Sequence, residues 1–225
     1  MSKHVEINER FFETWTPESA WVLGILFTDG HYGKANASGI RRVYVAQKDT
    51  ELLEKVKNLM GSKHKIVRNK QSDKINIIHY FSFTNKNIYE SLIKAGLVAK
   101  KSHIIKFPGM PKKYIRHFLR GCWDGDGSFY YENNNPKRIR GDYISGSLDF
   151  ISIFVQELRQ LSGINNISIL QKHHKPNCYY IKLSPNQTVK LFPVLYEDVP
   201  ETMYLSRKYA KIKQSYELLV LGKSQ

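Results

Sequence analysis

Hydrophobic residues follow a helical spacing in two stretches that lie at corresponding places in the two halves of the chain. Residues 52–60 and 150–161 place apolar side chains on one face of a helix, and each stretch ends near a glycine, Gly61 or Gly163. Around them lie aromatic and β-branched runs that are typical of strands. Strands are predicted within 31–45, 65–69, 75–83, 128–144, 167–171 and 178–183, and short helices at 88–95 and 188–196.

The chain contains an internal repeat. Residues 19–32 resemble residues 116–129, and the matching positions, 97 residues apart, are Gly24 and Gly121, Asp29 and Asp126, and Gly30 and Gly127. Each copy precedes the same order of elements and a basic segment, at 99–105 or 206–212. The order predicts an α+β fold of two αββαββα units related by a pseudo-two-fold axis. The units are predicted at 1–106 and 115–225, with a proline-containing linker at 107–114. The second copy is ten residues longer, and half of the excess is expected in the turn at 133–136.

Small residues line one face of the repeated helix. The positions recur with a spacing of four, as Ala20, Gly24 and Thr28 in the first copy and as His117, Gly121 and Gly125 in the second. Such a face lets two helices approach closely, so we expect the two copies to pack against each other. Asp29 and Asp126 then meet at one end of the pair. Two carboxylates so close together repel each other, so the arrangement is favourable only when cations bridge them. Paired carboxylates with a divalent metal suit phosphodiester hydrolysis.

Charge and composition limit the classes of partner and the cellular location that we expect for this chain. The chain has 35 Lys and Arg against 20 Asp and Glu, a net charge of +15, which favours a polyanion such as nucleic acid. The longest apolar run, 20–27, is too short to span a membrane. The first residues include acids and no apolar run, which argues against a secretory signal. Two cysteines make neither a disulfide framework nor a four-cysteine zinc site. We therefore expect a reducing intracellular location, either a prokaryotic cytoplasm or an organelle matrix.

The two repeated segments resemble a known pair of motifs. Residues 22–30, VLGILFTDG, and 119–127, LRGCWDGDG, are similar to the two LAGLIDADG motifs of monomeric homing endonucleases, and the resemblance covers nearly the whole chain. It implies a saddle formed by two antiparallel sheets over double-stranded DNA, with Mg²⁺ (or Mn²⁺ or Ca²⁺) between the motif acids. It also implies a monomer that makes a staggered double-strand break at a long asymmetric site.

The resemblance also assigns roles to residues. It implies that Asp29 and Asp126 are metal ligands, helped by the backbone carbonyls of Thr28 and Gly125, and that Gln47 organises solvent. The counterpart of Gln47 is Ser145 or Ser147. Lys101 and Lys208 match the basic residues that polarise the scissile phosphates or waters, with Lys100 and Arg207 as competitors. Phe27 stands where the second motif has Asp124, and we expect Asp124 to make structural hydrogen bonds.

DNA contacts are expected from polar and aromatic residues of the strands and turns, since Arg reads guanine, Asn reads adenine and Lys more often binds phosphate. The candidates are Lys34, Asn36, Arg41, Arg42, Tyr44, Arg68, Lys70, Tyr130, Glu132, Lys137, Arg138, Arg140, Tyr143 and Lys182. The aromatic residues Tyr80, Phe81 and Phe83 are expected in the core of a sheet. These assignments depend on which alternate residues of each strand face the DNA, because a shift of one residue exchanges the two faces of the sheet.

Two other functions use the same pattern. An RNA-splicing maturase or a non-cleaving DNA-binding protein could have this fold, but the presence of both motif acids favours the enzyme. A self-splicing intein is disfavoured, because Met-Ser at the start and Lys-Ser-Gln at the end lack the junction residues that protein splicing needs.

Overall fold

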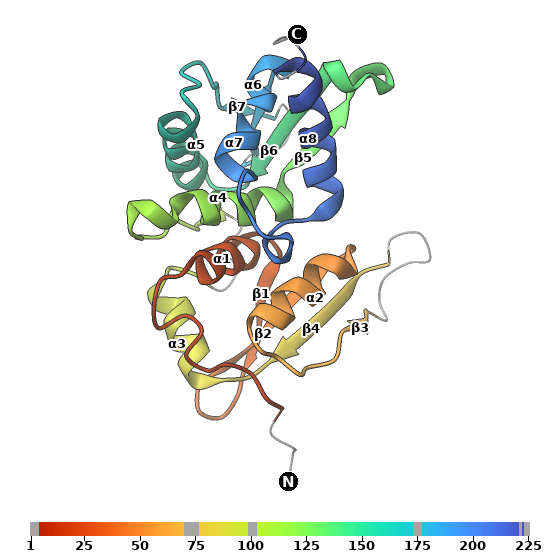
Figure 1. The fold of residues 1–225 in the computed structure, drawn as a ribbon. Coiled ribbons are helices and arrows are strands. Elements are labelled where there is room, and N and C mark those ends of the chain that lie inside the picture. Colours follow the sequence, from red (N-terminus) through yellow and green to blue (C-terminus); the bar gives the residue numbers. More distant parts are fainter. Residues whose placement is uncertain (1–4, 70–76, 99–102, 173–176, 221, 223–225) are drawn as a thin grey trace.

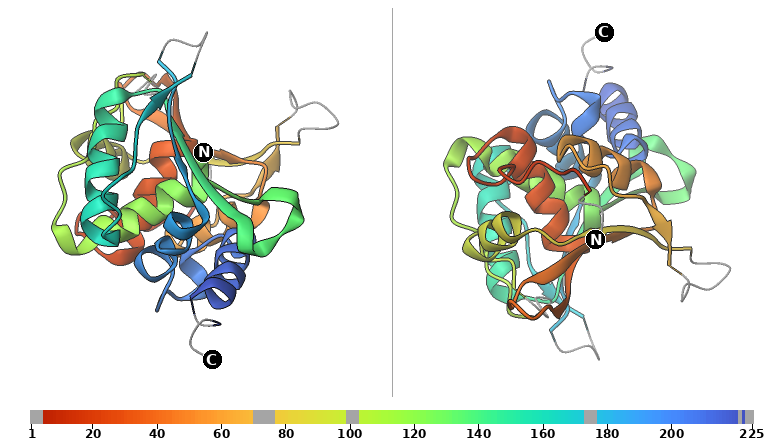
Figure 2. Two further views of the ribbon diagram at one scale, coloured as in Figure 1. Left: turned by 90° about the horizontal axis from the view of Figure 1, so that it is seen from above. Right: turned by 90° about the horizontal axis from the view of Figure 1, so that it is seen from below.

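A pair of helices, one from each half of the chain, lies at the centre of the structure (Figure 1). The computed structural model describes residues 5–69, 77–98, 103–172, 177–220 and 222. Helix α1 spans Pro17–Asp29 and helix α4 spans Lys112–Asp126. The two helices pack against each other, with the second sheet above the pair in Figure 1 and the first sheet below it, and Figure 2 shows the molecule from above and from below. The predicted helix pair is therefore present.

The first half has the predicted order αββαββα. After α1 come β1 (Gly30–Ala35), β2 (Arg41–Gln47), α2 (Thr50–Leu59), β3 (Val67–Arg68), β4 (His79–Phe83) and α3 (Lys86–Lys94). The strands form an antiparallel sheet in the order β1-β2-β4-β3. Helix α1 begins with a capping box, in which Thr16 and Ser19 each accept a backbone hydrogen bond, and Pro17 occupies the first helical position.

The second half repeats this arrangement and extends it. After α4 come β5 (Ser128–Tyr131), two 3-10 turns η2 (Glu132–Asn134) and η3 (Pro136–Arg138), β6 (Ile139–Ser145), α5 (Leu148–Ser162), β7 (Leu170–Gln171) and β8 (Tyr179–Leu183). Helices α6 (Pro185–Val189) and α7 (Leu191–Leu195), the turn η4 (Glu201–Met203) and helix α8 (Ser206–Leu219) complete it. The sheet order is β5-β6-β8-β7, also antiparallel. The fold class α+β with two four-stranded antiparallel sheets is thus confirmed.

Three boundaries differ from the sequence-based expectation. The predicted helix at 188–196 is divided into α6 and α7, because Pro193 lacks the N–H that would bond Val189 in a continuous helix. Helix α4 starts at Lys112, inside the predicted linker, with Pro111 at its N-cap. The half of the added length that was expected in the turn at 133–136 lies instead in α5, which has 15 residues where α2 has 10.

One hydrophobic core runs through both halves. Helix α1 is buried around its whole circumference from Ser19 to Phe27, because α4 covers one side and the first sheet the other. No helix among the described residues is long and apolar enough to cross a membrane. Both cysteines are free thiols, Cys122 buried and Cys178 partly exposed.

Candidate active site between two helix ends

The contact between α1 and α4 depends on two glycines. A Cβ atom at Gly24 would lie 2.7 Å from the backbone nitrogen of Cys122, and one at Gly121 would lie 3.0 Å from the Cα of Gly24. Each would also overlap a backbone carbonyl of the opposite helix, that of Phe118 or of Trp21. Since backbone atoms cannot yield as a flexible side chain can, any residue other than glycine would push the helices apart.

A buried carboxyl group links the two helices. Asp124, which has no solvent exposure, accepts hydrogen bonds from Nε1 of Trp21 at 2.9 Å and from the hydroxyl of Tyr196 at 2.8 Å. Burial raises the pKa of Asp124, while the charge of Lys208 and the two donors lower it. The structural role expected for Asp124 is therefore present. At the pseudo-symmetric place, Phe27 meets Phe118 edge to face, with ring centroids 5.2 Å apart.

The two motif acids stand at the adjoining C-terminal ends of these helices. Oδ2 of Asp29 lies 2.7 Å from the position that a Cβ of Gly125 would occupy, so the Asp29 carboxylate reaches the opposite helix. Thr28 and Asp126 line one pocket of about 250 Å³. Asp29 is partly buried and Asp126 is exposed. Two helix C-termini, each with a partial negative charge, and two carboxylates therefore face the same region, an arrangement that favours a cation.

The donors at this place suit a hard divalent cation. They are oxygen atoms from two carboxylates and from the backbone, the ligands that Mg²⁺, Mn²⁺ and Ca²⁺ prefer. Among the described residues no group of three or more His, Cys, Asp and Glu side chains gathers in one place. Two carboxylates alone are typical of Mg²⁺, which keeps waters and substrate phosphates among its ligands. The residues present thus fit such an ion.

Lys208 lies at the end of α4, buried and close enough to Asp29 and Asp126 for their charges to act on it. Its side chain is 3% exposed, and its Nζ donates to the carbonyls of Trp123 at 2.8 Å, Asp124 at 2.6 Å and Gly125 at 3.2 Å. Burial lowers the pKa of Lys208 to about 8, a shift that the nearby Asp124 partly opposes. Lys208 therefore holds the end of α4, and its predicted role toward the scissile phosphate stays a prediction.

Other predicted basic residues have different surroundings. Arg207, the competitor of Lys208, is exposed and pairs with Asp49 at 2.9 Å. Lys100 and Lys101 lie outside the described residues, so their predicted role stays a prediction.

Strand register distinguishes the two possible counterparts of Gln47. Gln47 is the last residue of β2 and pairs with His79, and Ser145 is the last residue of β6 and pairs with Tyr179 in the same way. Ser145 also lines the pocket that contains Thr28 and Asp126. Ser147 is instead buried, where it caps α5. Ser145 is therefore the positional equivalent of Gln47.

Each sheet has one face against helices and one open face. On the open faces lie five of the predicted DNA contacts, Arg42, Tyr44, Tyr130, Arg140 and Lys182. The register adds residues that sequence analysis missed, because the strand phase was unknown: His31, Ser82, Ser128, Asp142 and Tyr180. Tyr80 also lies on the open face and not in the core, whereas Phe81 and Phe83 are buried as expected.

One predicted DNA contact is wrong. Tyr143 is 2% exposed and stacks on Phe154, with ring centroids 4.2 Å apart, because it points from β6 toward the helices. Burial raises the pKa of Tyr143 well above its ordinary value, and the nearby Cys122, Asp126 and Asp29 raise it further. Tyr143 therefore lies beneath the motif acids and not on the DNA-facing surface.

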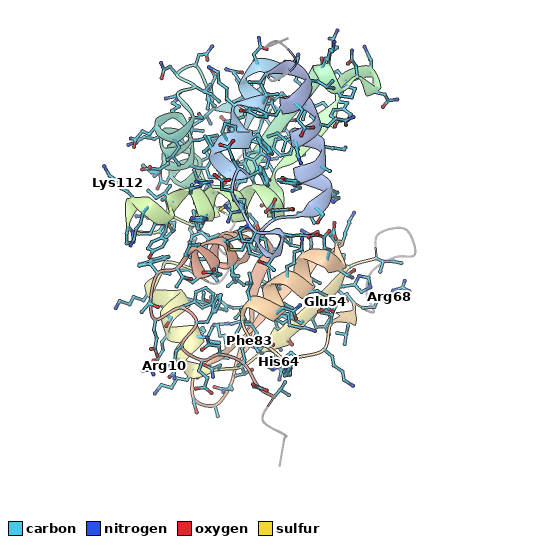
Figure 3. All side chains as sticks on the ribbon, viewed as in Figure 1. Arg10, Glu54, His64, Arg68, Phe83 and Lys112 are labelled. Carbon is cyan, nitrogen blue, oxygen red and sulfur yellow. The ribbon has the colours of Figure 1, made fainter. Side chains whose placement is uncertain are left out.

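The remaining candidates lie at margins and turns. Arg41 and Arg68 point to the helix side by register, and Figure 3 shows Arg68 at the outer edge of the first sheet. Lys34 and Lys137 are exposed near the hairpin turns. Asn36 accepts two backbone hydrogen bonds within its own turn, at 3.0 and 2.9 Å. Lys70 lies outside the described residues.

Glu132 forms a local ion-pair cluster at the second hairpin. Its carboxylate pairs with Arg138 at 3.0 Å and with Arg140 at 2.9 Å, and these contacts lower the pKa of Glu132. The cluster leaves a net positive charge and holds Arg140 at the open face.

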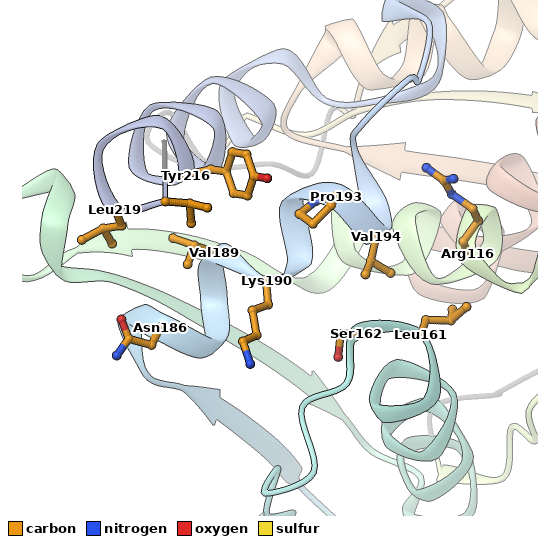
Figure 4. Close-up of a pocket in the computed structure, with 11 residues that line it drawn as sticks. Arg116, Leu161, Ser162, Asn186, Val189, Lys190, Pro193, Val194, Tyr216 and Leu219 are labelled. Atoms are coloured by element: carbon orange, nitrogen blue, oxygen red, sulfur yellow. The ribbon is translucent and has the colours of Figure 1, made fainter. Parts of the chain in front are cut away.

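A separate pocket of about 730 Å³ lies between α5, the α6–α7 pair and α8 (Figure 4). Its walls are largely apolar, with Arg116 and Lys190 as the charged residues. It contains neither motif acid, so the candidate active site remains the junction of α1 and α4.

This architecture is the fold of the two-motif homing endonucleases. The chain is similar to the homing endonuclease I-DmoI in its mesophilic variants, with a TM-score of 0.57 and 17% identity over 81% of this chain and 97% of that chain. The homing endonuclease I-WcaI bound to its DNA recognition sequence gives a TM-score of 0.57 and 13% identity over 89% of this chain and 91% of that chain. Full-length DUF199/WhiA from Thermatoga maritima gives a TM-score of 0.55 and 13% identity over 96% of this chain and 68% of that chain. No family model and no curated protein matches the sequence. At these identities the comparisons show the fold, and function has to be argued from the site.

Proposed function

We propose that this chain is a monomeric, site-specific DNA endonuclease of the LAGLIDADG type, which makes a staggered double-strand break at a long asymmetric site. The observation that carries the proposal is the meeting of Asp29 and Asp126 at the paired ends of α1 and α4. A pure binding protein has no need for two carboxylates where DNA phosphates would lie. The structures of I-DmoI with DNA and Mn and of I-WcaI with its recognition sequence support the same use of the fold.

In this proposal the two units, 1–106 and 115–225, each hold one half of the DNA site. Two halves that differ in sequence present different open faces, so the preferred DNA is asymmetric. The excess of 35 basic over 20 acidic residues draws the DNA to the protein, and exposed Arg42 and Lys182 lie on the faces that would bind it. The two sheets would together form the saddle over the DNA.

Asp29 and Asp126, with the carbonyls of Thr28 and Gly125, would hold the divalent cation. When bound, such an ion polarises a phosphoryl oxygen and activates a water molecule. Gln47 and its positional equivalent Ser145 would orient water on either side of the acids, and Lys101 would be the basic residue of the first half. Lys208 would be a positioning residue in this proposal, because its hydrogen bonds fix the carbonyls at the end of α4 beside Asp126.

The proposal is tested by substituting each motif acid. The wild-type protein, mixed with a randomised double-stranded DNA library and Mg²⁺, should cut a defined site and leave staggered ends. Asp29→Asn and Asp126→Asn should each abolish double-strand cleavage and keep most of the affinity for that site, because phosphate and base contacts lie on the sheets. Asp149→Asn, an exposed aspartate in the first turn of α5, is the matched control and should cleave like the wild type.

Two results would contradict the proposal. One is full cleavage by either motif variant, and the other is the absence of any defined cut by the wild type.

The burial of Lys208 favours a second candidate, a DNA-binding protein on the same fold that does not cleave. The Lys208 ammonium already donates to three backbone carbonyls, which would limit its action on a phosphate. Site-specific binding without cutting in Mg²⁺ or Mn²⁺ would decide for this candidate.

A further inference from the structure

A row of three side chains crosses the open face of the second sheet next to the motif acid. Asp142 on β6 pairs with Ser128 on β5 and with Lys182 on β8. Residues directly opposite on neighbouring strands have their Cβ atoms about 4.5–5.5 Å apart, so Asp142 and Lys182 are neighbours. The equivalent row of the first sheet consists of His31, Tyr44 and Ser82 and carries no carboxylate.

Asp142 has one oxygen atom that the described protein leaves unsatisfied. The Tyr130 hydroxyl hydrogen-bonds to this carboxyl group, but Oδ1 is buried and has no hydrogen-bond partner among the described residues. Burial raises the pKa of Asp142, whereas Lys182, Tyr130 and Arg140 lower it. A buried acceptor without a donor is unfavourable, so the carboxyl group would gain by turning toward a ligand that brings a donor.

The same carboxyl group lies beside the candidate active site. Asp126, Ser128, Asp142 and Lys182 line a pocket of about 360 Å³. DNA on the open face with a phosphate at Asp126 would therefore place a base pair near this pocket.

The charge of Asp142 limits what it could contact on DNA. A carboxylate repels phosphates, so its favourable partners are hydrogen-bond donors on base edges. In the major groove these are the exocyclic amines, N4 of cytosine and N6 of adenine. A lysine prefers the O6 and N7 acceptors of guanine. One base pair, C·G, presents a cytosine amine next to both guanine acceptors.

From these contacts we infer that Asp142 and Lys182 together read one C·G base pair in the major groove, close to the cleavage position of the half-site bound by the second unit. Asp142 accepts from cytosine N4, and Lys182 donates to guanine O6 or N7. Tyr130 holds the carboxyl group in place. This inference rests on the proposed function and names a specificity-determining pair for it.

The test is a cleavage-selection experiment in Mg²⁺ with a library randomised across the whole site, carried out on the wild type and three variants. The wild type should prefer C·G at one position near the cut, and Asp142→Ala should lose that preference by roughly fivefold to 150-fold, as for a good base contact. All other positions should keep their preferences. Lys182→Met should weaken selection for guanine at the same position. Tyr44→Ala, the positional equivalent in the first sheet, should change selection only in the other half-site.

Outcomes separate this inference from the proposed function. If the wild type selects and cuts no defined site, the proposed function fails. If it does, but Asp142→Ala retains every preference of the wild type, only the inference is overturned. The inference is also overturned if Asp142→Ala binds the site normally and cuts no sequence, since that result would make Asp142 part of the catalytic machinery. Melting temperatures of the variants verify that each one is folded.

Discussion

Substituting Trp21 tests whether a buried hydrogen bond holds the two motif helices in register. The change Trp21→Phe removes the Nε1 donor that lies 2.9 Å from Oδ2 of Asp124 and leaves Tyr196 as the remaining side-chain donor. Hydrogen bonds to charged groups contribute about 1.5–3 kcal/mol. The variant also loses some packing, because Trp21 is completely buried.

The chain offers a matched control for the packing loss. Trp123 is also completely buried, in the opposite helix, but its Nε1 has no hydrogen-bond partner among the described residues. Trp123→Phe therefore shortens the side chain without breaking a hydrogen bond. For a chain of 225 residues, 1 kcal/mol shifts the melting temperature by about 2–4 °C, so Trp21→Phe should melt roughly 3–12 °C below Trp123→Phe.

The pH dependence gives a second, independent readout. The native pKa of Asp124 lies above the ordinary aspartate value of 3.8, so the folded state holds this proton more tightly than the unfolded state. Stability contributed by Asp124 is then lost as pH rises from the ordinary value through the native pKa. Removing the Trp21 donor raises the native pKa further. The extra destabilisation of Trp21→Phe should therefore be larger at about pH 7 than at about pH 4.5, measured by chemical denaturation. Equal melting temperatures for the two variants, or a difference that does not shrink in acid, would refute the reasoning.

Two further predictions concern the helix contact and the basic surface. Gly121→Ala should lower stability by about 1–3 kcal/mol and reduce cleavage, because its Cβ would meet the backbone of α1. Gly109→Ala is the control, since open space surrounds that position, and it should change stability by less than about 0.5 kcal/mol. Unchanged melting temperatures for both variants would exclude the close helix contact. If 6–10 phosphates are neutralised, DNA affinity measured by titration should fall roughly 10³–10⁵-fold between about 50 and 200 mM salt, and a salt-independent affinity would place the DNA elsewhere.

The repeat made much of this fold predictable from sequence. Gly24 and Gly121 marked a close helix contact at a recognisable spacing, and two acids at the ends of those helices then had to meet. Both inferences depend on local periodicity, which a single sequence contains. The two sheets followed from the same repeated order of elements.

Residues whose role depends on side-chain direction were less predictable. Tyr143 and Asp142 are adjacent, and the sequence alone does not fix which of them faces the open side of β6. Burial of Tyr143 against Phe154 decides the phase, and this contact joins a strand to a helix. Lys208 is similar, because its three carbonyl partners come from the end of α4, more than 80 positions earlier in the chain. Such long-range packing leaves no local pattern that distinguishes a buried lysine from an exposed one.

The two sides of the helix contact are held by different chemistry, and this makes the halves complementary. Trp21 meets Asp124 on one side, and Phe118 meets Phe27 on the other. Two copies of the second half would each place Phe118 against Asp124, and two buried carboxyl groups would lose a donor. Two copies of the first half would place Trp21 against Phe27, and two indole N–H groups would lose their acceptor. Neither half can therefore form a well-satisfied homodimer along this contact, and separately expressed halves should pair with each other rather than with themselves.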